Sequence, residues 1–379
     1  MKSIRTENFT RIIESTNFRF LEAMEDLVRI RDKFGEILFE NKAMRKVIQT
    51  LILKDKHSAD SETSFFKFYN EYKNLRKENQ ILETEVNLDN ILYSVKISPI
   101  YDNKSEIMGY IEVYRDITLE RNITKELYLT NEHIQEQIVL AKNIQKSILP
   151  KRNKIKNISF QYGYEPSEDL SGDLFDVIEI TKNKIGVYIA DVVGHGISAS
   201  IMTMFIRQSI RSVLNENPYL GASDTIRMLK KMFRQLDLDV DQYFSIFYMV
   251  IDLDNKKICY VNAGHNCMPI LFNDKYLAYL PNKGKFISNL FPDEAYIEKE
   301  LDLYPDDRIF IYTDGLIETV NYKGELFGEE RLVNWIKKNR QEEDLVEKLL
   351  KEINLFRWKE QTDDIAILYL KIGREENET

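Results

Sequence analysis

The sequence predicts an α+β protein made of three consecutive parts, and three observations lead to this prediction. From residue 151 onward, strand-like and helix-like runs are interspersed, and successive strand-like runs such as FSIFYMVIDL and KICYVNAG are joined by short polar turns. Short connections of this kind form hairpins, so the sheets should be largely antiparallel. Residues 119–149 contain neither glycine nor proline, which predicts one long helix. The residues before them mix short strand-like and helical runs.

The first part is predicted to be a small mixed domain over residues 20–118, preceded by a helical extension over residues 1–19. Near its start, a turn at Asp32 to Gly35 joins two apolar runs, and Asn41 is expected to open a helix. Its end, ILYSVKISPIYDNKSEIMGYIEVYRDIT, predicts two alternating strands around a polar turn. The charged stretch between these regions, FYNEYKNLRKENQILETEVN, predicts a helix that runs into a loop.

The second part, residues 119–150, is predicted to be a helix that ends at Pro150. Its narrow apolar stripe and polar remainder are typical of a two-stranded coiled coil, so we expect a homodimer formed through this helix. A helix packed on its own domain is the alternative. The stripe recurs at steps of three, four or seven residues and consists of Ile123, Leu127, Ile134, Ile138, Ala141, Ile144 and Ile148.

The third part, residues 151–373, is predicted to be a layered α+β domain with a tail at 374–379. Two helices, at about 197–214 and 222–236, should follow the third strand, and another pair should follow Phe327. The expected strands are ISFQYGYEP, DLFDVIEI, KIGVYIAD, FSIFYMVIDL, KICYVNAG, PILFN, RIFIYTD and DIAILYLKI.

The charge distribution argues against one class of function. The formal net charge of the 379 residues is −9, and residues 151–379 alone carry 38 acidic and 30 basic side chains. An acidic C-terminal half of this kind does not favour a binding groove for a polyanion such as a nucleic acid, so we expect no nucleic-acid partner.

Three features predict a cytoplasmic protein without a membrane span. The first residues, MKSIRTENFTRIIEST, are charged throughout and lack the apolar region of a signal peptide. The most apolar runs are shorter than the roughly 20 residues that cross a bilayer. The two cysteines, Cys259 and Cys267, have no CxxC spacing and are interpreted as reduced thiols.

Aspartates recur where the predicted strands of the third part begin or end. One aspartate before a glycine is an ordinary turn signal, but several beside strands apolar enough to be central would gather their carboxylates at one edge of the core. Clustered carboxylates resist ionisation unless a cation neutralises them, and oxygen ligands suit Mg²⁺ or Mn²⁺. Two such ions can activate a water and clamp a phosphoryl group, which predicts phosphoester hydrolysis. The candidates are Asp173, Asp176, Asp191, Asp314, Asp363 and Asp364.

A rival site lies in YMVIDLDNKK, where a strand is followed by Asp252-x-Asp254, the spacing of an aspartyl-phosphate nucleophile in haloacid-dehalogenase-type enzymes. Lys256 stands where that motif has Thr or Val, and ICYVNAG returns at once as a partner strand. The pattern therefore favours a hairpin turn. Neither cysteine opens the Cys-x5-Arg loop of a thiol phosphatase.

Six motifs occur in the order found in metal-dependent PPM-type serine/threonine phosphatases: SGDLFD, ADVVGHG, VNAGHN, YTDGLIETVN, FGEERL and TDDIAIL. From about residue 140 to residue 372, the chain resembles the SpoIIE branch of that family, which includes the RsbU-like regulators. The resemblance implies a protein serine/threonine phosphatase with two antiparallel sheets sandwiched between helices. It also implies two Mn²⁺ or Mg²⁺ ions in each catalytic domain.

The same resemblance assigns roles to the aspartates. It implies that Asp191 bridges the two ions and that the Val192 carbonyl ligates one of them. Asp314 and Asp363 would ligate the other ion. Gly194, close behind the bridging residue, would let the backbone approach an ion or a phosphate.

Four further positions follow from the comparison with this family. Asp173 corresponds to a nearby acidic position that acts either through water or by supporting a residue that binds an ion. Asp364 occupies a slot where relatives often carry asparagine, so it ranks below its neighbour Asp363 as a ligand. His195 lies one or two positions from a histidine that the broader family links to leaving-group protonation, with support of the loop as the alternative. His265 belongs to an AGH element and is interpreted as a buried, hydrogen-bonding histidine.

The first part resembles a PAS sensor domain. RIRDKFGEILFENKAM is similar to the first hairpin and following asparagine of such domains, and the two strands that end in DIT resemble their last two strands. His57 is the single histidine before residue 119 and lies in a charged stretch, while both cysteines lie in the third part. Neither a haem ligand nor a flavin-binding cysteine is therefore expected.

ITKELYLTNEHIQEQIVLAKNIQKSILP resembles the helix that joins sensor and phosphatase in this family, with its IQxSxLP ending. In relatives, dimerising helices reposition the two helices after the bridging aspartate, here 197–214 and 222–236. Their usual substrate is a phosphoserine or phosphothreonine on a STAS-domain anti-sigma-factor antagonist. We therefore expect a signal-regulated phosphatase that dimerises through its PAS domain and linker helix. The alternatives are a catalytically inactive PAS and coiled-coil scaffold, or another metal-dependent phosphoesterase.

Overall fold

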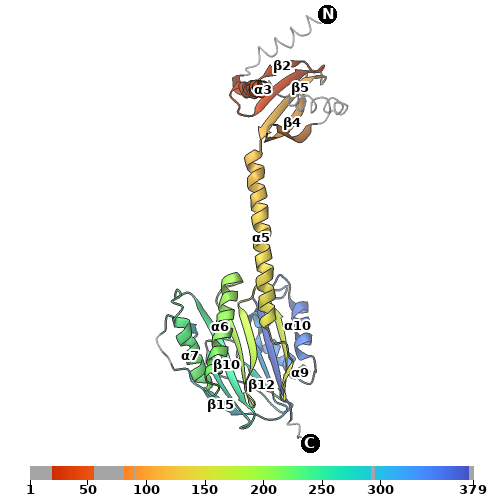
Figure 1. Ribbon diagram of the computed structural model, residues 1–379. Helices are drawn as coiled ribbons and strands as arrows, with labels where there is room; N and C mark the ends of the chain where they lie inside the picture. Colours follow the sequence, from red (N-terminus) through yellow and green to blue (C-terminus); the bar gives the residue numbers. More distant parts are fainter. Residues whose placement is uncertain (1–18, 55–80, 89, 292–294, 375–379) are drawn as a thin grey trace, which may run out of the picture. The chain divides into compact units, whose positions relative to one another are not determined.

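The computed structural model describes residues 19–54, 81–88, 90–291 and 295–374 and divides the chain into two compact units, 1–133 and 134–379. Figure 1 shows the elements of both units. The predicted helical extension, the predicted tail, His57 and most of the charged stretch FYNEYKNLRKENQ lie outside the described residues. Within the described ranges, no helix combines the length and the apolar character needed to cross a membrane.

The N-terminal unit is built on one antiparallel sheet of five strands, in the order β2-β1-β5-β4-β3. The predicted first hairpin and the predicted last two strands are confirmed, because β1 pairs with β2 and β4 pairs with β5. The described elements of this unit are α2 (Arg19–Glu22), β1 (Leu27–Asp32), β2 (Ile37–Glu40), α3 (Lys42–Lys54), β3 (Leu82–Leu88), β4 (Ile91–Tyr101) and β5 (Ile107–Asp116).

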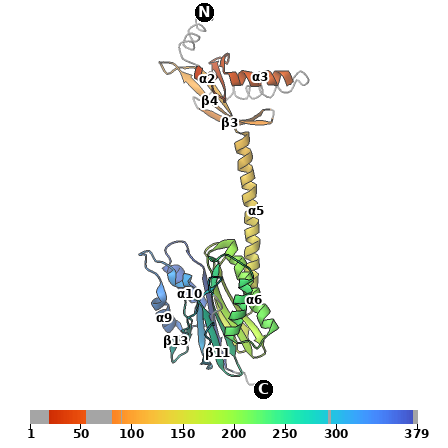
Figure 2. The same cartoon turned by 90° about the vertical axis from the view of Figure 1, so that its left-hand side faces the viewer.

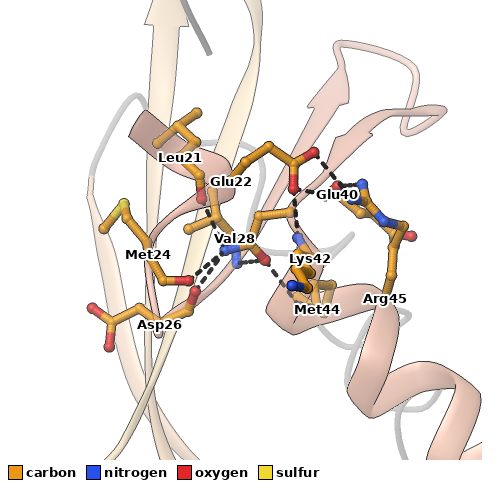
Figure 3. Close-up of polar contacts among 10 residues, drawn as sticks. Leu21, Glu22, Met24, Asp26, Val28, Glu40, Lys42, Met44 and Arg45 are labelled. Carbon is orange, nitrogen blue, oxygen red and sulfur yellow. Dashed lines mark hydrogen bonds and ion pairs between the residues drawn. The ribbon is translucent and has the colours of Figure 1, made fainter. Parts of the chain in front are cut away.

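Asn41 ties β1 to α2 and α3, and Figure 3 labels its partners Leu21, Met24, Asp26, Val28 and Met44. Its side-chain oxygen accepts hydrogen bonds from the backbone N–H groups of Val28, at 3.1 Å, and of Met44, at 2.9 Å. The second bond caps the first turn of α3, which confirms the predicted helix start. Its amide nitrogen donates to the backbone carbonyls of Leu21, Met24 and Asp26. The buried Asn41 side chain therefore holds together the segment that leads into β1 and the start of α3, which follows β2.

The predicted long helix is confirmed as α5 (Thr118–Ile148), whose ends lie within one residue of the predicted 119–149. At its start, the Asp116 carboxylate accepts a hydrogen bond from the Thr118 backbone N–H at 2.9 Å. Much of its apolar stripe is uncovered in the single chain. Ile123, Leu127, Ile134 and Ile144 are each between 44% and 66% exposed. The coiled coil that would cover these residues stays a prediction.

The C-terminal unit contains two sheets, and every strand pair in them is antiparallel, as predicted. The first sheet has the order β15-β11-β10-β9-β8, with β14 paired to β10. Its strands are β8 (Asp173–Thr181), β9 (Lys184–Val192), β10 (Tyr243–Asp252), β11 (Lys257–Ala263), β14 (Ile287–Ser288) and β15 (Lys299–Asp302).

The second sheet has the order β13-β12-β16-β17-β7-β6. Its central strands β16 and β17 are buried along almost their whole length. Its strands are β6 (Lys154–Ile155), β7 (Ile158–Glu165), β12 (Ile270–Phe272), β13 (Leu277–Tyr279), β16 (Arg308–Tyr312) and β17 (Ile365–Ile372).

The two sheets pack face to face over one apolar core, to which they contribute large side chains such as Phe175, Phe247 and Leu368. Helices α6 and α7 cover a second apolar cluster on the outer face of the first sheet. Helices α9 and α10 cover a third cluster on the outer face of the second sheet, as Figure 2 shows. The predicted sandwich of helices around two sheets is therefore confirmed. The helices are α6 (Gly196–Glu216), α7 (Ala222–Arg234), α8 (Asp314–Glu318), α9 (Gly328–Asn339) and α10 (Leu345–Phe356).

Candidate functional site

The predicted aspartates occupy neighbouring strand ends of the two sheets. Asp173 opens β8 and lies directly opposite Asp191, near the end of β9. In the other sheet, Asp314 opens α8 directly after β16, and Asp363 and Asp364 precede β17, the partner strand of β16. Because antiparallel neighbours place the end of one strand beside the start of the next, each pair shares one edge of its sheet.

Thr313 joins the two pairs across the sandwich. Its hydroxyl donates a hydrogen bond to Asp173 Oδ2 at 2.7 Å and accepts one from the Ala366 backbone N–H at 2.8 Å. Asp173 belongs to the first sheet, whereas Thr313 and Ala366 belong to the β16 and β17 ends of the second. All three residues are buried. Since Thr313 immediately precedes Asp314, this contact ties the two aspartate-bearing edges together.

The carboxylates also act on one another electrostatically. Burial, followed by the charge of Asp191, raises the pKa of Asp173 well above its ordinary value. Burial, followed by the charges of Asp314 and Asp363, raises the pKa of Asp191 to about 7. The pKa of Asp363 rises to about 6, again chiefly through burial. Asp173, Asp191, Asp314 and Asp363, called the aspartate cluster below, thus carry charge that is unfavourable without a neutralising cation.

The donor set of the aspartate cluster suits a hard divalent cation. Carboxylate oxygens, together with the Val192 carbonyl beside Asp191, are ligands that Mg²⁺ and Mn²⁺ prefer. Gly194 has a φ of +89°, which lets the backbone turn sharply behind these groups. In the part of the chain that the structure describes, no three Asp, Glu, His or Cys side chains converge closely enough to hold an ion. The residues fit a cation in charge and chemistry, and the individual ligands stay predictions.

Asp364 is engaged by the loop that precedes β8. Its Oδ1 accepts hydrogen bonds from the Ser167 backbone N–H at 2.7 Å and the Ser167 hydroxyl at 2.9 Å. Its Oδ2 accepts from the Ser171 hydroxyl at 2.9 Å and the Gly172 backbone N–H at 2.7 Å. These four bonds stabilise the buried carboxylate without a metal. Asp363 is more exposed than its buried neighbour Asp364 and therefore remains the stronger candidate ligand of the two.

The last turns of α5 contact the same loop. The buried Gln145 amide donates to the Ser171 carbonyl at 2.7 Å and accepts from the Ser171 backbone N–H at 3.1 Å. The Ser171 hydroxyl in turn accepts a hydrogen bond from the Asp173 backbone N–H at 3.0 Å. A chain of hydrogen bonds thus leads from the linker helix to the aspartate cluster. No role was assigned to Gln145 from the sequence, although it is the glutamine of the IQxSxLP ending, which was the available signal.

Asp176 lies outside the aspartate cluster, which corrects its place among the candidate carboxylates. It follows Asp173 by three residues in β8, so alternation along the strand puts it on the opposite face. It is buried and pairs with Arg211 of α6 at 2.7 Å and with Arg207 at 3.4 Å. Burial raises the pKa of Asp176, and the two arginines oppose that rise. Asp176 therefore holds α6 against the sheet.

His265 is buried and hydrogen-bonded, which confirms its interpretation. Its Nε2 lies 2.9 Å from the Tyr312 carbonyl, and its backbone N–H donates to the Asn262 side chain at 2.7 Å. The next residue, Asn266, donates from its amide to Asp314 Oδ2 at 2.8 Å. His265 thus anchors the loop from which Asn266 reaches a predicted metal ligand. The sequence did not single out Asn266.

The pKa of His265 predicts a measurable dependence of stability on pH. Burial lowers this pKa from its ordinary 6.5 to about 4. Between these values the unfolded chain binds a proton that the folded chain does not, so stability falls as the pH falls from about 6.5 to about 4. The fall attributable to this residue should reach about 3 kcal/mol.

Urea denaturation in EDTA at pH 7.5 and pH 4.5, on the wild type and His265→Gln, measures this effect. The destabilisation caused by the substitution should shrink by about 2–3 kcal/mol at the lower pH. Ser209→Ala, at a buried residue that does not titrate, is the control and should change stability by the same amount at both pH values. An equal effect of His265→Gln at both pH values would contradict the assignment.

His195 lies on the connection between β9 and α6 and is exposed. Its Nδ1 is 3.0 Å from Glu168 Oε2, on the loop that precedes β8. This contact is consistent with support of the loop. A part in leaving-group protonation stays a prediction.

The rival aspartates form a hairpin turn, as the sequence favours. Strands β10 and β11 pair directly, with Asp252 opposite Lys257. Asp252 Oδ1 accepts a hydrogen bond from the Asn255 backbone N–H at 2.9 Å, which closes the turn. Asp254 accepts one from the Asn183 side chain at 2.7 Å and is exposed. These contacts account for both aspartates structurally.

The chain has recognisable relatives in sequence. The family described as stage II sporulation protein E (SpoIIE) matches residues 181–373. Phosphoserine phosphatase RsbP of Bacillus subtilis (strain 168) is 29% identical over 187 residues, which cover 48% of this chain and 46% of RsbP. Phosphoserine phosphatase RsbU of the same strain is 25% identical over 216 residues, which cover 56% of this chain and 60% of RsbU. The chain therefore spans about half the length of these relatives.

Solved structures share its fold. The SiaA-PP2C domain of Pseudomonas aeruginosa is similar with a TM-score of 0.56 and 19% identity, over 64% of this chain and 98% of that one. The RsbU and RsbW domains of Rv1364c from Mycobacterium tuberculosis are similar with a TM-score of 0.50 and 18% identity, over 59% of this chain and 63% of that one.

Proposed function

Because this chain belongs to the SpoIIE family, we propose that it is a metal-dependent protein phosphatase that hydrolyses phosphoserine or phosphothreonine. The observation that carries the proposal is the aspartate cluster, in which two sheets bring four carboxylates into one another's electric field. An all-oxygen cluster of this charge is suited to two hard cations at a phosphoester. The relatives named above as phosphoserine phosphatases support the same chemistry.

The proposed ligands divide between two Mn²⁺ or Mg²⁺ ions. Asp191 would bridge them, the Val192 carbonyl would bind one, and Asp314 and Asp363 would bind the other. When bound, the ions would supply an activated water and a clamp on the phosphoryl group.

Neighbouring residues would orient these ligands. Asn266 donates to Asp314 Oδ2, which leaves the other carboxylate oxygen of Asp314 for an ion. Thr313 donates to Asp173 Oδ2 and so fixes the carboxylate that faces Asp191 across the strand pair. Partners of this kind commonly decide the direction in which a ligand points. Asp364 is assigned to the loop that its four hydrogen bonds hold.

The N-terminal unit is proposed to be a PAS-type sensor that controls the phosphatase through a dimeric linker. Its first hairpin, the hydrogen bonds of Asn41 and its last two strands agree with that resemblance. The exposed apolar stripe of α5 supports pairing with the α5 helix of a second chain. As the family resemblance implies, the proposed substrate is a phosphorylated STAS-domain anti-sigma-factor antagonist.

Metal-dependent release of phosphate tests the proposed function. The full chain should hydrolyse p-nitrophenyl phosphate, and a phosphorylated STAS-domain protein, when Mn²⁺ or Mg²⁺ is added after treatment with EDTA. Without added metal, release should fall to the level of buffer alone. Hydrolysis that persists unchanged in EDTA, or a complete lack of hydrolysis with either metal, would contradict the proposal.

A further inference from the structure

A hollow of about 560 Å³ opens beside the aspartate cluster. Gly315 and Asp363 are among the residues that line it. Gly315 directly follows Asp314, and Asp363 is itself a member of the cluster. The rest of the lining comes from two segments, 319–324 and 357–362. The hollow therefore adjoins the proposed reaction site, and all of its lining belongs to the C-terminal unit.

Hydrogen bonds hold the two lining segments in place. The Trp358 backbone N–H donates to the Val320 carbonyl at 3.0 Å, which joins one segment to the other. The Gln361 amide donates to the Glu165 carbonyl at 2.6 Å and to the Asp363 carbonyl at 2.7 Å. A surface that is already ordered loses little conformational entropy when it binds a partner.

Two aromatic side chains stand at the surface of this hollow, one on each segment. Tyr322 is 67% exposed and Trp358 is 66% exposed. Their ring centroids lie 6.2 Å apart in an edge-to-face arrangement. Exposed neighbouring aromatic rings at the mouth of a site are a common feature of surfaces that bind a partner, and Tyr and Trp are the residue types enriched at binding hot spots. We call this pair the aromatic shelf.

The charges around the aromatic shelf favour an acidic partner. Lys323 and Lys359 are exposed and line the hollow, and Lys323 Nζ lies 5.5 Å from the centre of the Tyr322 ring. The cation Arg357 is bound to Glu165 at 3.3 Å. Glu360 and Asp363 are exposed in the same lining, and Asp363 is a proposed metal ligand, so two lysines face one further carboxylate. Residues 151–379 carry 38 acidic and 30 basic side chains, so the hollow is locally more basic than the rest of the unit.

We propose that this hollow binds the polypeptide next to the phosphorylated residue of a protein substrate. An apolar side chain of that polypeptide lies on the aromatic shelf, and an acidic side chain lies near Lys323 and Lys359. The inference rests on the proposed function, because it takes the aspartate cluster as the place where the phosphoryl group is cleaved. It adds a substrate class, which is a phosphoserine or phosphothreonine followed or preceded within a few residues by apolar and acidic side chains.

Short phosphoserine peptides test this proposal on the full chain with Mn²⁺ bound. One pair of peptides carries Leu and Glu on either the amino or the carboxyl side of the phosphoserine, and a matched pair carries Ser and Lys in their place. The ratio of kcat/KM for a peptide to kcat/KM for p-nitrophenyl phosphate measures recognition beyond the phosphoryl group. In Tyr322→Ser/Trp358→Ser this ratio should fall about tenfold for the better Leu-Glu peptide, through KM.

Two further variants make the test specific. Lys323→Glu/Lys359→Glu should lower the ratio for the Leu-Glu peptide and raise it for the Ser-Lys peptide, a gain that misfolding cannot produce. Tyr219→Ser removes an aromatic ring that is 79% exposed elsewhere on the unit and should leave every ratio unchanged.

The outcomes separate this proposal from the proposed function. If the wild type hydrolyses neither peptide nor p-nitrophenyl phosphate, the proposed function fails and this inference fails with it. If the wild type hydrolyses both, but the aromatic and lysine variants keep wild-type ratios, the inference is overturned and the proposed function stands. If light scattering shows that the variants change the oligomeric state and leave the ratios unchanged, the shelf is a contact between copies, which also overturns the inference.

Discussion

Replacing Asp191 with asparagine is expected to lower kcat for phosphate release by more than about a hundredfold. Loss of a side chain that merely orients a metal ligand commonly costs about 10–100-fold, so loss of the proposed bridge between two ions should cost more. The variant should still fold, because the charge of Asp191 is itself unfavourable beside Asp314 and Asp363 when no cation is bound. Phosphate release with Mn²⁺ and thermal unfolding in EDTA measure the two effects.

Asp254→Asn is the matched control for this substitution. Asp254 also follows an apolar strand, but it is exposed in the hairpin turn and bound to Asn183. Its replacement should leave activity close to that of the wild type. Turnover close to wild type in Asp191→Asn would refute the two-metal site, whereas complete loss in Asp254→Asn would revive the aspartyl-phosphate alternative.

Charge substitutions in the apolar stripe of α5 should weaken dimerisation and activity together. Ile134 is 46% exposed in the single chain, and Ile138 follows one turn later on the same face. Ile134→Glu/Ile138→Glu would place two carboxylates in the seam of the proposed coiled coil, where apolar side chains are required. We expect at least a tenfold weaker dimer, about 1.4 kcal/mol or more, with a parallel loss of phosphatase activity. Light scattering and phosphate release on the same samples measure both.

Gln135→Glu/Asn143→Glu adds the same two charges at exposed positions about 100° and 180° around the helix from Ile134, off the stripe, and should leave the dimer intact. The linker proposal fails if the isoleucine double variant becomes monomeric and yet keeps full, signal-responsive activity. That outcome would leave the metal-site proposal unaffected, because the aspartate cluster lies wholly within the C-terminal unit.

Elements with strong local signals could be predicted closely from the sequence. The ends of α5 were located within one residue because no helix breaker interrupts residues 119–149 and Pro150 stops the helix. The edges that carry Asp173, Asp191 and Asp314 followed from apolar runs that begin or end at an aspartate. Such runs are long enough to identify a buried strand without knowledge of its neighbours.

The contacts that surround the aspartate cluster could not be predicted in this way. Asp364 and Ser167 are 197 residues apart in sequence, and Asn266 and Asp314 are 48 apart. Each pair meets through a loop whose own sequence has no periodicity, so its path is set by the packing of the two sheets. Asp176 is a further example. Its motif resembles that of a metal site, but its side chain lies on the face of β8 that packs against α6.

The two hydrogen bonds between Gln145 and Ser171 give any rotation of α5 a free-energy cost. Both end on one residue, so a rotation of the helix by a single residue, about 100°, breaks them together. Breaking them leaves buried polar groups unpaired, at about 1–3 kcal/mol each. A penalty of about 2 kcal/mol already restricts the disengaged register to a few per cent of molecules. Under the proposed linker mechanism, a signal from the N-terminal unit would therefore have to supply more than this free energy to move the loop beside the aspartates.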